Sequence, residues 1–384
     1  MNIRSRWWRA AAGATVVALS LALAACGTSS NSTSGGPTSS ASENAYQARL
    51  NALYKGTYAE PTGPTVKAPT GKSIWLIESS LGSDYATRGV AAAKQAAAKL
   101  GWSVHVFDAK FDPTQMLTGV QQAVVARASG IILSAIDCPT VKNAMVQAKA
   151  AHIPVVGIEV KDCTPSLFSH IVTYRNHQDF GQADQEWGAA QAAWVIAKTN
   201  GHAKVVIDTE TDAWTTLDAS QGIRSEIAKC PGCSIVGDAK FVGTDLGPAL
   251  QQKIEQALIQ HPDANAFIPA YDVVMTQSGG AQAIQSAGRL HSLTIMGGEG
   301  TAALIAQIRN GTGAQACAGQ SVEWEMYSAM DALVRLFLNK DPNLVDTGMG
   351  VQLCDKTHNL PPAGQPYAPP VDFRSAFLKM WSLS

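Results

Sequence analysis

The chain has 384 residues, 46% hydrophobic and 15% charged, a globular composition long enough for two domains. Its net charge is −1, and no run of lysine or arginine gives it a local attraction for a phosphate backbone. We therefore expect no binding to DNA or RNA.

The N-terminus has the pattern of an export signal. Arg4, Arg6 and Arg9 precede an apolar stretch, 10–25, that is too short and alanine-rich for a good membrane span. This stretch ends Leu-Ala-Ala-Cys, which resembles the lipobox of bacterial lipoproteins. We interpret 1–25 as a lipoprotein signal peptide. Cys26 would then carry the lipid that anchors an exported chain to the outer face of the cytoplasmic membrane; a secretory peptide cut nearby, with Cys26 incidental, is the alternative.

The segment after the cysteine predicts a flexible tether. Residues 28–42 are almost all Ser, Thr, Gly and Asn, and 58–72 contain three prolines. We therefore predict a tether over 26–72, with a short helix at 43–55, and folded structure from Ser73 onward.

Strands and helices alternate from Ser73. Gly101 follows a helical stretch as a C-cap, and Asp112 with Pro113 marks the start of the next helix. The predicted strands are 73–79, 102–108, 130–136 and 153–159, and the helices between them are 84–100, 112–128 and 139–151. This alternation indicates right-handed crossovers and a parallel sheet.

The alternation then repeats. After a long helix at 177–198, strands are predicted at 203–208, 234–241, 264–270 and 293–299, with helices at 215–229, 247–260 and 273–287. Two open α/β units in one chain predict two lobes. Ligands of such sheets bind beyond the carboxyl ends of the strands, so we expect a cleft where the lobes face each other.

The block 100–159 combines a strand, a helix starting Asp-Pro, the strand "GIIL", a helix and the strand "IPVV". It resembles the type I periplasmic binding proteins of the ribose/galactose-binding group, and 261–288 is similar to another unit of that family. The resemblance covers about 73–340. It implies an α/β fold of two Rossmann-like lobes with parallel sheets and a three-crossing hinge. The lobes would be 73–170 plus 321–340, and 171–320 plus 341–384.

The resemblance also implies a function. The family binds sugars and related small polar molecules, hands them to an ABC permease and is not enzymatic. A module that presents the same ligand to a membrane receptor is the alternative. We expect a monomer that needs no cofactor. We also expect no metal site, since the eight histidines lack metal-ligand spacing. A hydrolase would need a Gly-x-Ser-x-Gly or His-Glu-x-x-His motif, and neither occurs.

Asp137 ends a buried strand, where a carboxylate can accept hydrogen bonds from sugar hydroxyls; capping the following helix is its alternative role. The resemblance implies further ligand contacts at polar strand ends, namely Glu159, Tyr271, Asp272, Glu299 and Gln320. Tyr85 and Trp214 are candidates for stacking on a sugar ring, and ordinary core packing is the alternative role of both. The chain also departs from the family. The arginine that the family has before the second helix of the C-lobe has no counterpart in "DAWTTLDASQG" of this chain.

Six of the seven cysteines remain for disulfides once Cys26 is set aside, and six permit fifteen pairings. Cys138 and Cys163 each follow the end of a strand in successive units, so we predict that they pair. Cys230 and Cys233 resemble a redox motif but follow a helix, which favours a local structural bridge. Cys317, in a late strand, is then left to pair with Cys354 in the tail.

Overall fold

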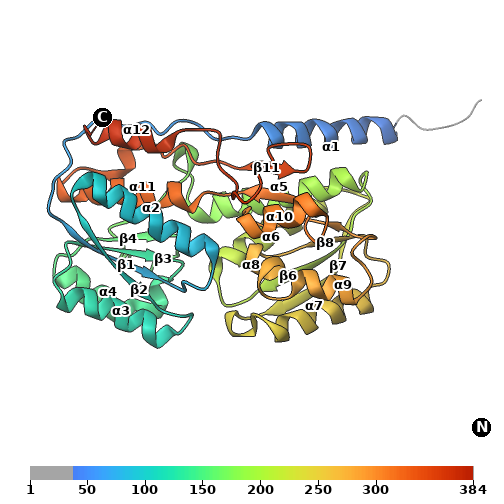
Figure 1. The fold of residues 1–384 in the computed structure, drawn as a ribbon, viewed down its shortest axis with the longest axis horizontal. Coiled ribbons are helices and arrows are strands. Elements are labelled where there is room, and N and C mark those ends of the chain that lie inside the picture. The colour runs from blue at the N-terminus through green and yellow to red at the C-terminus, as the bar shows by residue number, and fades with distance from the viewer. Residues whose placement is uncertain (1–37, 384) are drawn as a thin grey trace, which may run out of the picture. The chain divides into compact units, whose positions relative to one another are not determined.

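The computed structural model describes residues 38–383 (Figure 1). The predicted signal peptide and Cys26 lie outside the described residues. Within residues 38–383, no helix is both long and apolar enough to cross a membrane.

The first sheet has five parallel strands in the order β2-β1-β3-β4-β5. Their bounds are β1 (Ser73–Glu78), β2 (Ser103–Asp108), β3 (Gly130–Ser134), β4 (Val155–Ile158) and β5 (His170–Ile171). The strand β3 is buried at every position. A central strand that is covered on both faces reads as a continuous apolar run, which is how "GIILS" stands in the sequence.

Helices cover both faces of this sheet (Figure 1). Ile132 packs with helices α2 (Asp84–Leu100) and α11 (Val322–Phe337), whereas Ile131 packs on the opposite face with α3 (Pro113–Val125) and α4 (Cys138–Ala150). The predicted helix ends are confirmed. Gly101 takes the left-handed conformation with φ of 68°, and the Asp112 carboxylate accepts from the backbone N–H of Thr114 at 2.7 Å.

The second sheet has four parallel strands in the order β7-β6-β8-β9. They are β6 (Lys204–Glu210), β7 (Ser234–Phe241), β8 (Ala266–Ile268) and β9 (Thr294–Ile295). One face packs on α5 (Phe180–Lys198) and α6 (Trp214–Ala228), and the other on α7 (Pro248–Gln260) and α10 (Ala302–Asn310). The fold class is therefore confirmed: two Rossmann-like parallel sheets, each with its own core.

The single helix predicted at 273–287 is wrong, because two helices stand there. They are α8 (Asp272–Thr276) and α9 (Gly280–Ser286). Gly279, between them, has φ of 81°, and a Cβ on Gly280 would lie 2.7 Å from the carbonyl oxygen of Val274. The glycine pair therefore allows a break that a continuous helical pattern hides.

The segment predicted as a tether is ordered over much of its length. The helix α1 (Thr38–Lys55) begins before the predicted 43–55 and ends at the same residue, and it buries Leu50 and Tyr54 in the core of the second sheet. Farther along, the backbone N–H of Val66 donates to the carbonyl of Met380 at 2.8 Å. The helix predicted at 43–55 is confirmed, whereas a flexible 56–72 is wrong, because Tyr58, Val66 and Ala68 pack against the core of the first sheet.

The C-terminal tail contacts both cores. Strand β11 (Gln352–Asp355) pairs antiparallel with β10 (Ala316–Gly319), and β10 continues the edge of the second sheet through a bridge between Met296 and Ala316. The last helix, α12 (Phe373–Met380), packs instead with α11 in the core of the first sheet. The expectation that all of 341–384 lies with the second lobe overlooked the aromatic residues of this segment: Phe373 of α12 and Trp381, just past its end, both pack on Tyr327 of α11.

All three predicted disulfides are present. Their Cα–Cα distances are 5.3 Å for Cys138–Cys163, 5.3 Å for Cys230–Cys233 and 5.0 Å for Cys317–Cys354. The last pair joins residues that stand directly opposite each other in the β10–β11 ladder.

Candidate functional site

The carboxyl ends of the first sheet carry two glutamates. Ile74 and Leu76 of β1 face the core under α2 and α11, so Glu78, two residues on, faces the same side. Its side chain is 2% exposed, and its Oε1 has no hydrogen-bond partner. Burial raises the Glu78 pKa to about 8, and Glu159, just beyond β4, adds to the rise.

Two tyrosines connect Glu159 to a third glutamate. The Tyr85 hydroxyl, in the first turn of α2, lies 3.3 Å from both Glu159 Oε1 and Glu325 Oε2. The Tyr174 hydroxyl donates to Glu325 Oε1 at 2.5 Å. Glu325 lies in the first turns of α11 and is 1% exposed, and burial raises its pKa to about 7.

The second sheet contributes a carboxylate from beyond β9. Glu299 Oε2 accepts from the backbone N–H of Asp272 at 2.8 Å. Burial, then Asp272, and then Glu159 raise the Glu299 pKa. Glu159 follows β4 of the first sheet and Glu299 follows β9 of the second, so each lies at the carboxyl end of its own sheet.

A fourth acid, Asp184 on α5, completes what we name the acidic cluster: Asp184, Glu159, Glu299 and Glu325. Asp184 is 5% exposed. Burial, followed by the charges of Glu159 and Glu325, raises its pKa. The cluster joins a helix and a strand end from each of the two cores.

Asp137 lies at a separate contact between the two cores. Its Oδ1 accepts from the Lys161 backbone N–H at 2.6 Å. The Lys161 ammonium lies 3.2 Å from the centroid of the Trp214 ring. Asp137 stands at the N-cap of α4 but makes no side-chain bond to that helix, so the capping alternative is not realised. A ligand contact for Asp137 and Trp214 stays a prediction.

The other predicted residues surround the acidic cluster or brace it. Asp272 is 1% exposed, and its carboxylate accepts from the backbone N–H groups of Gly298, Gly300 and Thr301, so it holds the loop that carries Glu299. Burial, and then the charge of Glu210 on the same edge of the second sheet, raises the Tyr271 pKa.

Gln320 follows β10 and donates its backbone N–H to the Glu299 carbonyl at 3.1 Å. Together with Tyr174 and Trp187 it lines a cavity of about 20 Å³, measured for the centre of a water-sized sphere. Such a volume holds about one water molecule, so the residues are packed closely here.

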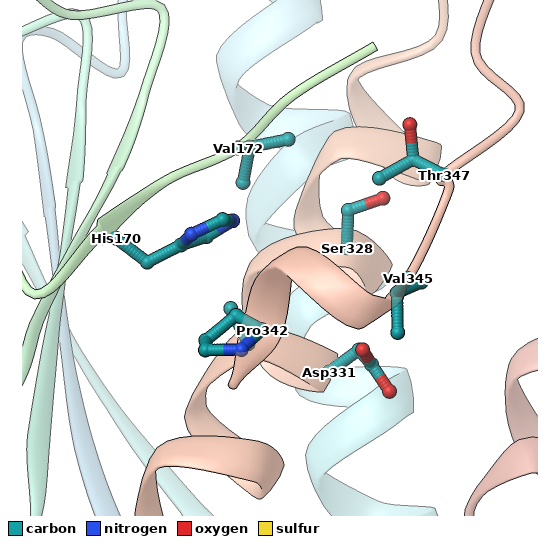
Figure 2. Close-up of a pocket in the computed structure, with 8 residues that line it drawn as sticks. His170, Val172, Ser328, Asp331, Pro342, Val345 and Thr347 are labelled. Carbon is teal, nitrogen blue, oxygen red and sulfur yellow. The ribbon is translucent and has the colours of Figure 1, made fainter. Parts of the chain in front are cut away.

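A second small cavity lies away from the cluster, between β5 and α11 (Figure 2). His170, Ser328, Asp331 and Thr347 line it, and its volume on the same measure is about 10 Å³. Burial lowers the His170 pKa to about 4. A polar space of this size suits a single water molecule and not a sugar.

Sequence reasoning missed four residues of the site: Glu78, Tyr174, Asp184 and Glu325. Glu325 carried a usable signal. It is an acid within the apolar run of a helix that buries Trp324 and Met326 beside it. Charged side chains are seldom fully buried without a partner, so an acid there indicates a special role. The residues Asp184 and Tyr174 carried no comparable signal.

The fold and this arrangement of strand-end acids define a two-core α/β binding protein. Comparison with known proteins agrees: the family description "Periplasmic binding protein domain" matches residues 74–341. The chain therefore belongs to the periplasmic binding protein domain family, which consists of exported solute-binding proteins and not of enzymes.

Individual relatives are distant in sequence. The ribose import binding protein RbsB of Escherichia coli K12 is 25% identical over 257 residues, which is 63% of this chain and 81% of that protein. Among solved structures, the glucose-galactose binding protein GanP of Geobacillus stearothermophilus has a TM-score of 0.65 at 21% identity, covering 75% of this chain and 98% of that one. A solute-binding protein of Burkholderia graminis, in complex with D-arabinose, has a TM-score of 0.64 at 20% identity, covering 76% and 98%.

Proposed function

We propose that this chain is the substrate-binding protein of an ABC importer and captures a sugar or similar small polar ligand between its two lobes. The observation that carries the proposal is that each sheet presents an acid just beyond the carboxyl end of one of its strands, Glu159 after β4 and Glu299 after β9. A ligand held by both carboxylates would join the lobes. The names of the relatives, which bind ribose, glucose and galactose, or D-arabinose, support a sugar-sized ligand.

Binding would work by hinge closure. The residues around the acidic cluster are packed too closely to admit a sugar, so the lobes must part before a ligand enters. The ligand then stabilises the closed form to the extent that it binds this form more tightly than the open one. Asp137, Lys161 and Trp214 would form part of the rim that meets on closure.

The division into lobes that we propose follows the two cores. Residues 73–170 and 321–340 would form one lobe and 171–320 the other. Strand β11 belongs with the second lobe, whereas α12 returns to the first.

A thermal-shift screen of the purified protein against sugars and polyols tests the proposal. A ligand that binds only the folded form raises the melting temperature by mass action. We expect a shift with at least one compound and its loss in Glu159→Gln and Glu299→Gln. A matched change on α7, Glu255→Gln, should leave the shift intact. A shift that persists unchanged in both cluster variants would reject this site.

We also propose that the chain is anchored by a lipid on Cys26 and delivers its ligand, as a monomer, to a membrane permease. The apolar stretch at 10–25 and the small residues before Cys26 support the anchor. Cys26→Ser should move the protein from the membrane fraction to the soluble fraction of the producing cells. Retention of the variant in the membrane fraction would contradict a lipid anchor at this residue.

A further inference from the structure

The chain that precedes β1 passes from one core to the other. Leu50 and Tyr54 of α1 pack in the core of the second sheet, whereas Val66 packs against the core of the first. The residues that connect them, 55–65, are named here the N-terminal crossing. They lie outside residues 74–341, which the family description matches. In Figure 1 they are the blue chain that leaves α1 and runs past α12 toward β1.

Both ends of the N-terminal crossing are held by buried charged side chains. On the side of the second core, the Tyr54 hydroxyl donates to the carboxylate of Asp355. On the side of the first core, the guanidinium of Arg335, which pairs with Asp331 at 2.8 Å, donates to the carbonyl oxygen of Pro64 at 3.0 Å. Because each end is held to a different core, the N-terminal crossing must change its conformation when the cores move apart.

Between its ends, the N-terminal crossing pairs with the hinge segment in which the chain passes from the first core at Met349 to the second at Val351. The backbone N–H of Thr57 donates to the carbonyl of Val351 at 3.0 Å, and that of Ala59 donates to the carbonyl of Gly348 at 2.9 Å. A Cβ on Gly348 would lie 2.1 Å from the Ala59 carbonyl oxygen, so the two backbones approach as closely as only glycine allows. Hinges open through φ and ψ changes at a few residues, and the bonds of a paired segment oppose such changes.

Tyr58 connects the N-terminal crossing to a second hinge segment, the passage from β10 to α11. Its hydroxyl donates to the carbonyl oxygen of Gly319, at the end of β10, at 2.9 Å. Its ring packs against both cores. The centroid of the ring lies 5.5 Å from that of Trp324 on α11 and 6.4 Å from that of Tyr367, which belongs to the second core. One side chain therefore contacts both lobes where they are joined.

We propose that the N-terminal crossing is an additional hinge segment that restricts how far the two lobes open. The inference rests on the proposed function, in which the lobes part to admit a ligand. Opening would break or strain the bonds from Thr57, Tyr58 and Ala59, so these bonds favour the closed arrangement. Without them, the ligand-free protein would open farther and over a wider range of distances.

Distances between two spin labels, measured by pulsed electron spin resonance on the ligand-free protein, report the opening directly. One label would replace Gln122 on α3 and the other Gln256 on α7, both of which are exposed. A keto amino acid that carries the nitroxide leaves the native disulfides intact. The helix α3 packs on the face of its sheet opposite α11, and α7 on the face opposite α5, so both labels lie away from the N-terminal crossing.

Two substitutions in the full chain release the crossing to different degrees. Tyr58→Phe removes only the hydroxyl that bonds Gly319, and Ala59→Pro removes the N–H that bonds Gly348. We expect both to shift the distance distribution to longer values and to broaden it, Ala59→Pro more strongly. The matched control is Tyr46→Phe on α1, because the Tyr46 hydroxyl makes no hydrogen bond within the described part of the chain; it should leave the distribution unchanged.

The melting temperature of each variant shows whether it is folded, and Tyr58→Phe alone carries the test if Ala59→Pro is not. Distributions of the folded variants that match the wild type, or that move to shorter distances, would overturn the inference. Either result leaves the proposed function standing, since the thermal-shift screen tests ligand binding separately and does not depend on how far the lobes open.

Discussion

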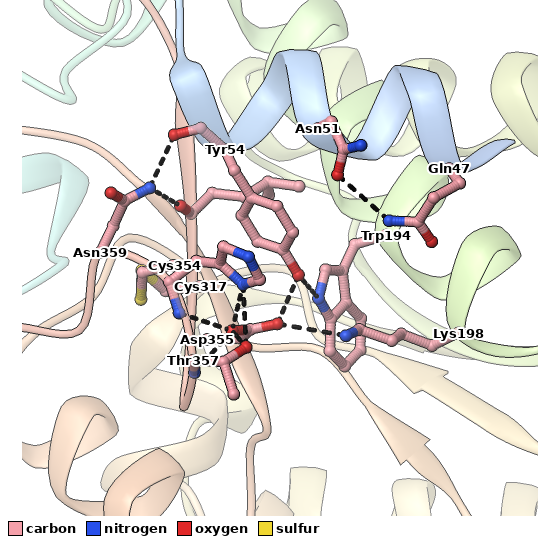
Figure 3. Close-up of polar contacts among 12 residues, drawn as sticks. Gln47, Asn51, Tyr54, Trp194, Lys198, Cys317, Cys354, Asp355, Thr357 and Asn359 are labelled. Carbon is pink, nitrogen blue, oxygen red and sulfur yellow. Dashed lines mark hydrogen bonds and ion pairs between the residues drawn. A yellow bond between two sulfur atoms is a disulfide. The ribbon is translucent and has the colours of Figure 1, made fainter. Parts of the chain in front are cut away.

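Asp355 is the point at which the N-terminal helix is fastened to the rest of the chain (Figure 3). Its carboxylate accepts from the Tyr54 hydroxyl of α1 and from Thr357, and it pairs with Lys198 of α5 at 3.2 Å. Burial opposes the charge, but these hydrogen bonds outweigh it and lower the Asp355 pKa well below its usual range. The Trp194 indole N–H donates to the same tyrosine oxygen at 3.2 Å.

Tyr54→Phe should lower the free energy of unfolding by about 1–3 kcal/mol, because it removes a buried hydrogen bond to a charged group. Urea unfolding at pH 7 measures the change. Gln47→Ala, on an exposed turn of the same helix, is the control, since the bond from Gln47 to Asn51 is exposed. Equal effects of the two substitutions would show that the Tyr54 hydroxyl does not fasten α1.

Among the elements, the three disulfides differ in the length of chain that they close. The sequence separations are 25 for Cys138–Cys163, 3 for Cys230–Cys233 and 37 for Cys317–Cys354. Cross-linking restricts the unfolded chain more when the closed loop is longer. The short bridge after α6 should therefore matter least to stability.

Replacing both cysteines of a pair by alanine should cost roughly 4 kcal/mol for Cys317–Cys354, roughly 3.5 for Cys138–Cys163 and roughly 1.5 for Cys230–Cys233, by the loop-closure relation. Urea unfolding of the three double variants gives the order. A larger loss from the Cys230–Cys233 pair than from either long-range pair would contradict it.

The same elements show how far the sequence could predict this structure. Strands such as "GIILS" and helices that start at Asp112 or end at Gly101 have strong local signals, because burial on two faces and capping act over a few residues. The break at Gly279 and the docking of α12 depend on contacts with distant segments, which local patterns do not contain.

The candidate site likewise contains residues that could be predicted from the sequence and residues that could not. The resemblance predicts Glu159 and Glu299 at polar strand ends, and parallel strands bring their carboxyl ends to one edge of a sheet. The partners Asp184 and Tyr174 come from a helix and a loop whose placement depends on the whole fold. The contact of Lys161, which bonds Asp137, with the Trp214 ring likewise depends on the relative placement of the two lobes.

For the molecule as a whole, buried acids predict an unusual dependence of stability on pH. Burial raises the pKa of Glu78 and of Asp208 to about 8, whereas unfolded carboxyls titrate near 4. The native state therefore holds more protons than the unfolded chain between these values, and the free energy of unfolding falls as pH rises through this window. His170, with its pKa lowered to about 4, acts in the opposite sense, but only below about pH 6.5.

We therefore expect the ligand-free protein to lose stability between pH 6.5 and 8, and Glu78→Gln to remove about 1–2 kcal/mol of that loss. Urea unfolding across this range measures both effects. The variant should gain stability mainly at pH 8, where the native carboxylate begins to ionise. A wild-type protein whose free energy of unfolding rises from pH 6.5 to 8 would contradict the assignment of these buried acids.

The most direct test of the whole account is a crystal structure of the protein with the compound that gives the largest thermal shift. We predict one ligand molecule held by Glu159 from beyond β4 of the first sheet and by Glu299 from beyond β9 of the second. A ligand that contacts residues of only one sheet, or that lies away from both glutamates, would contradict the account.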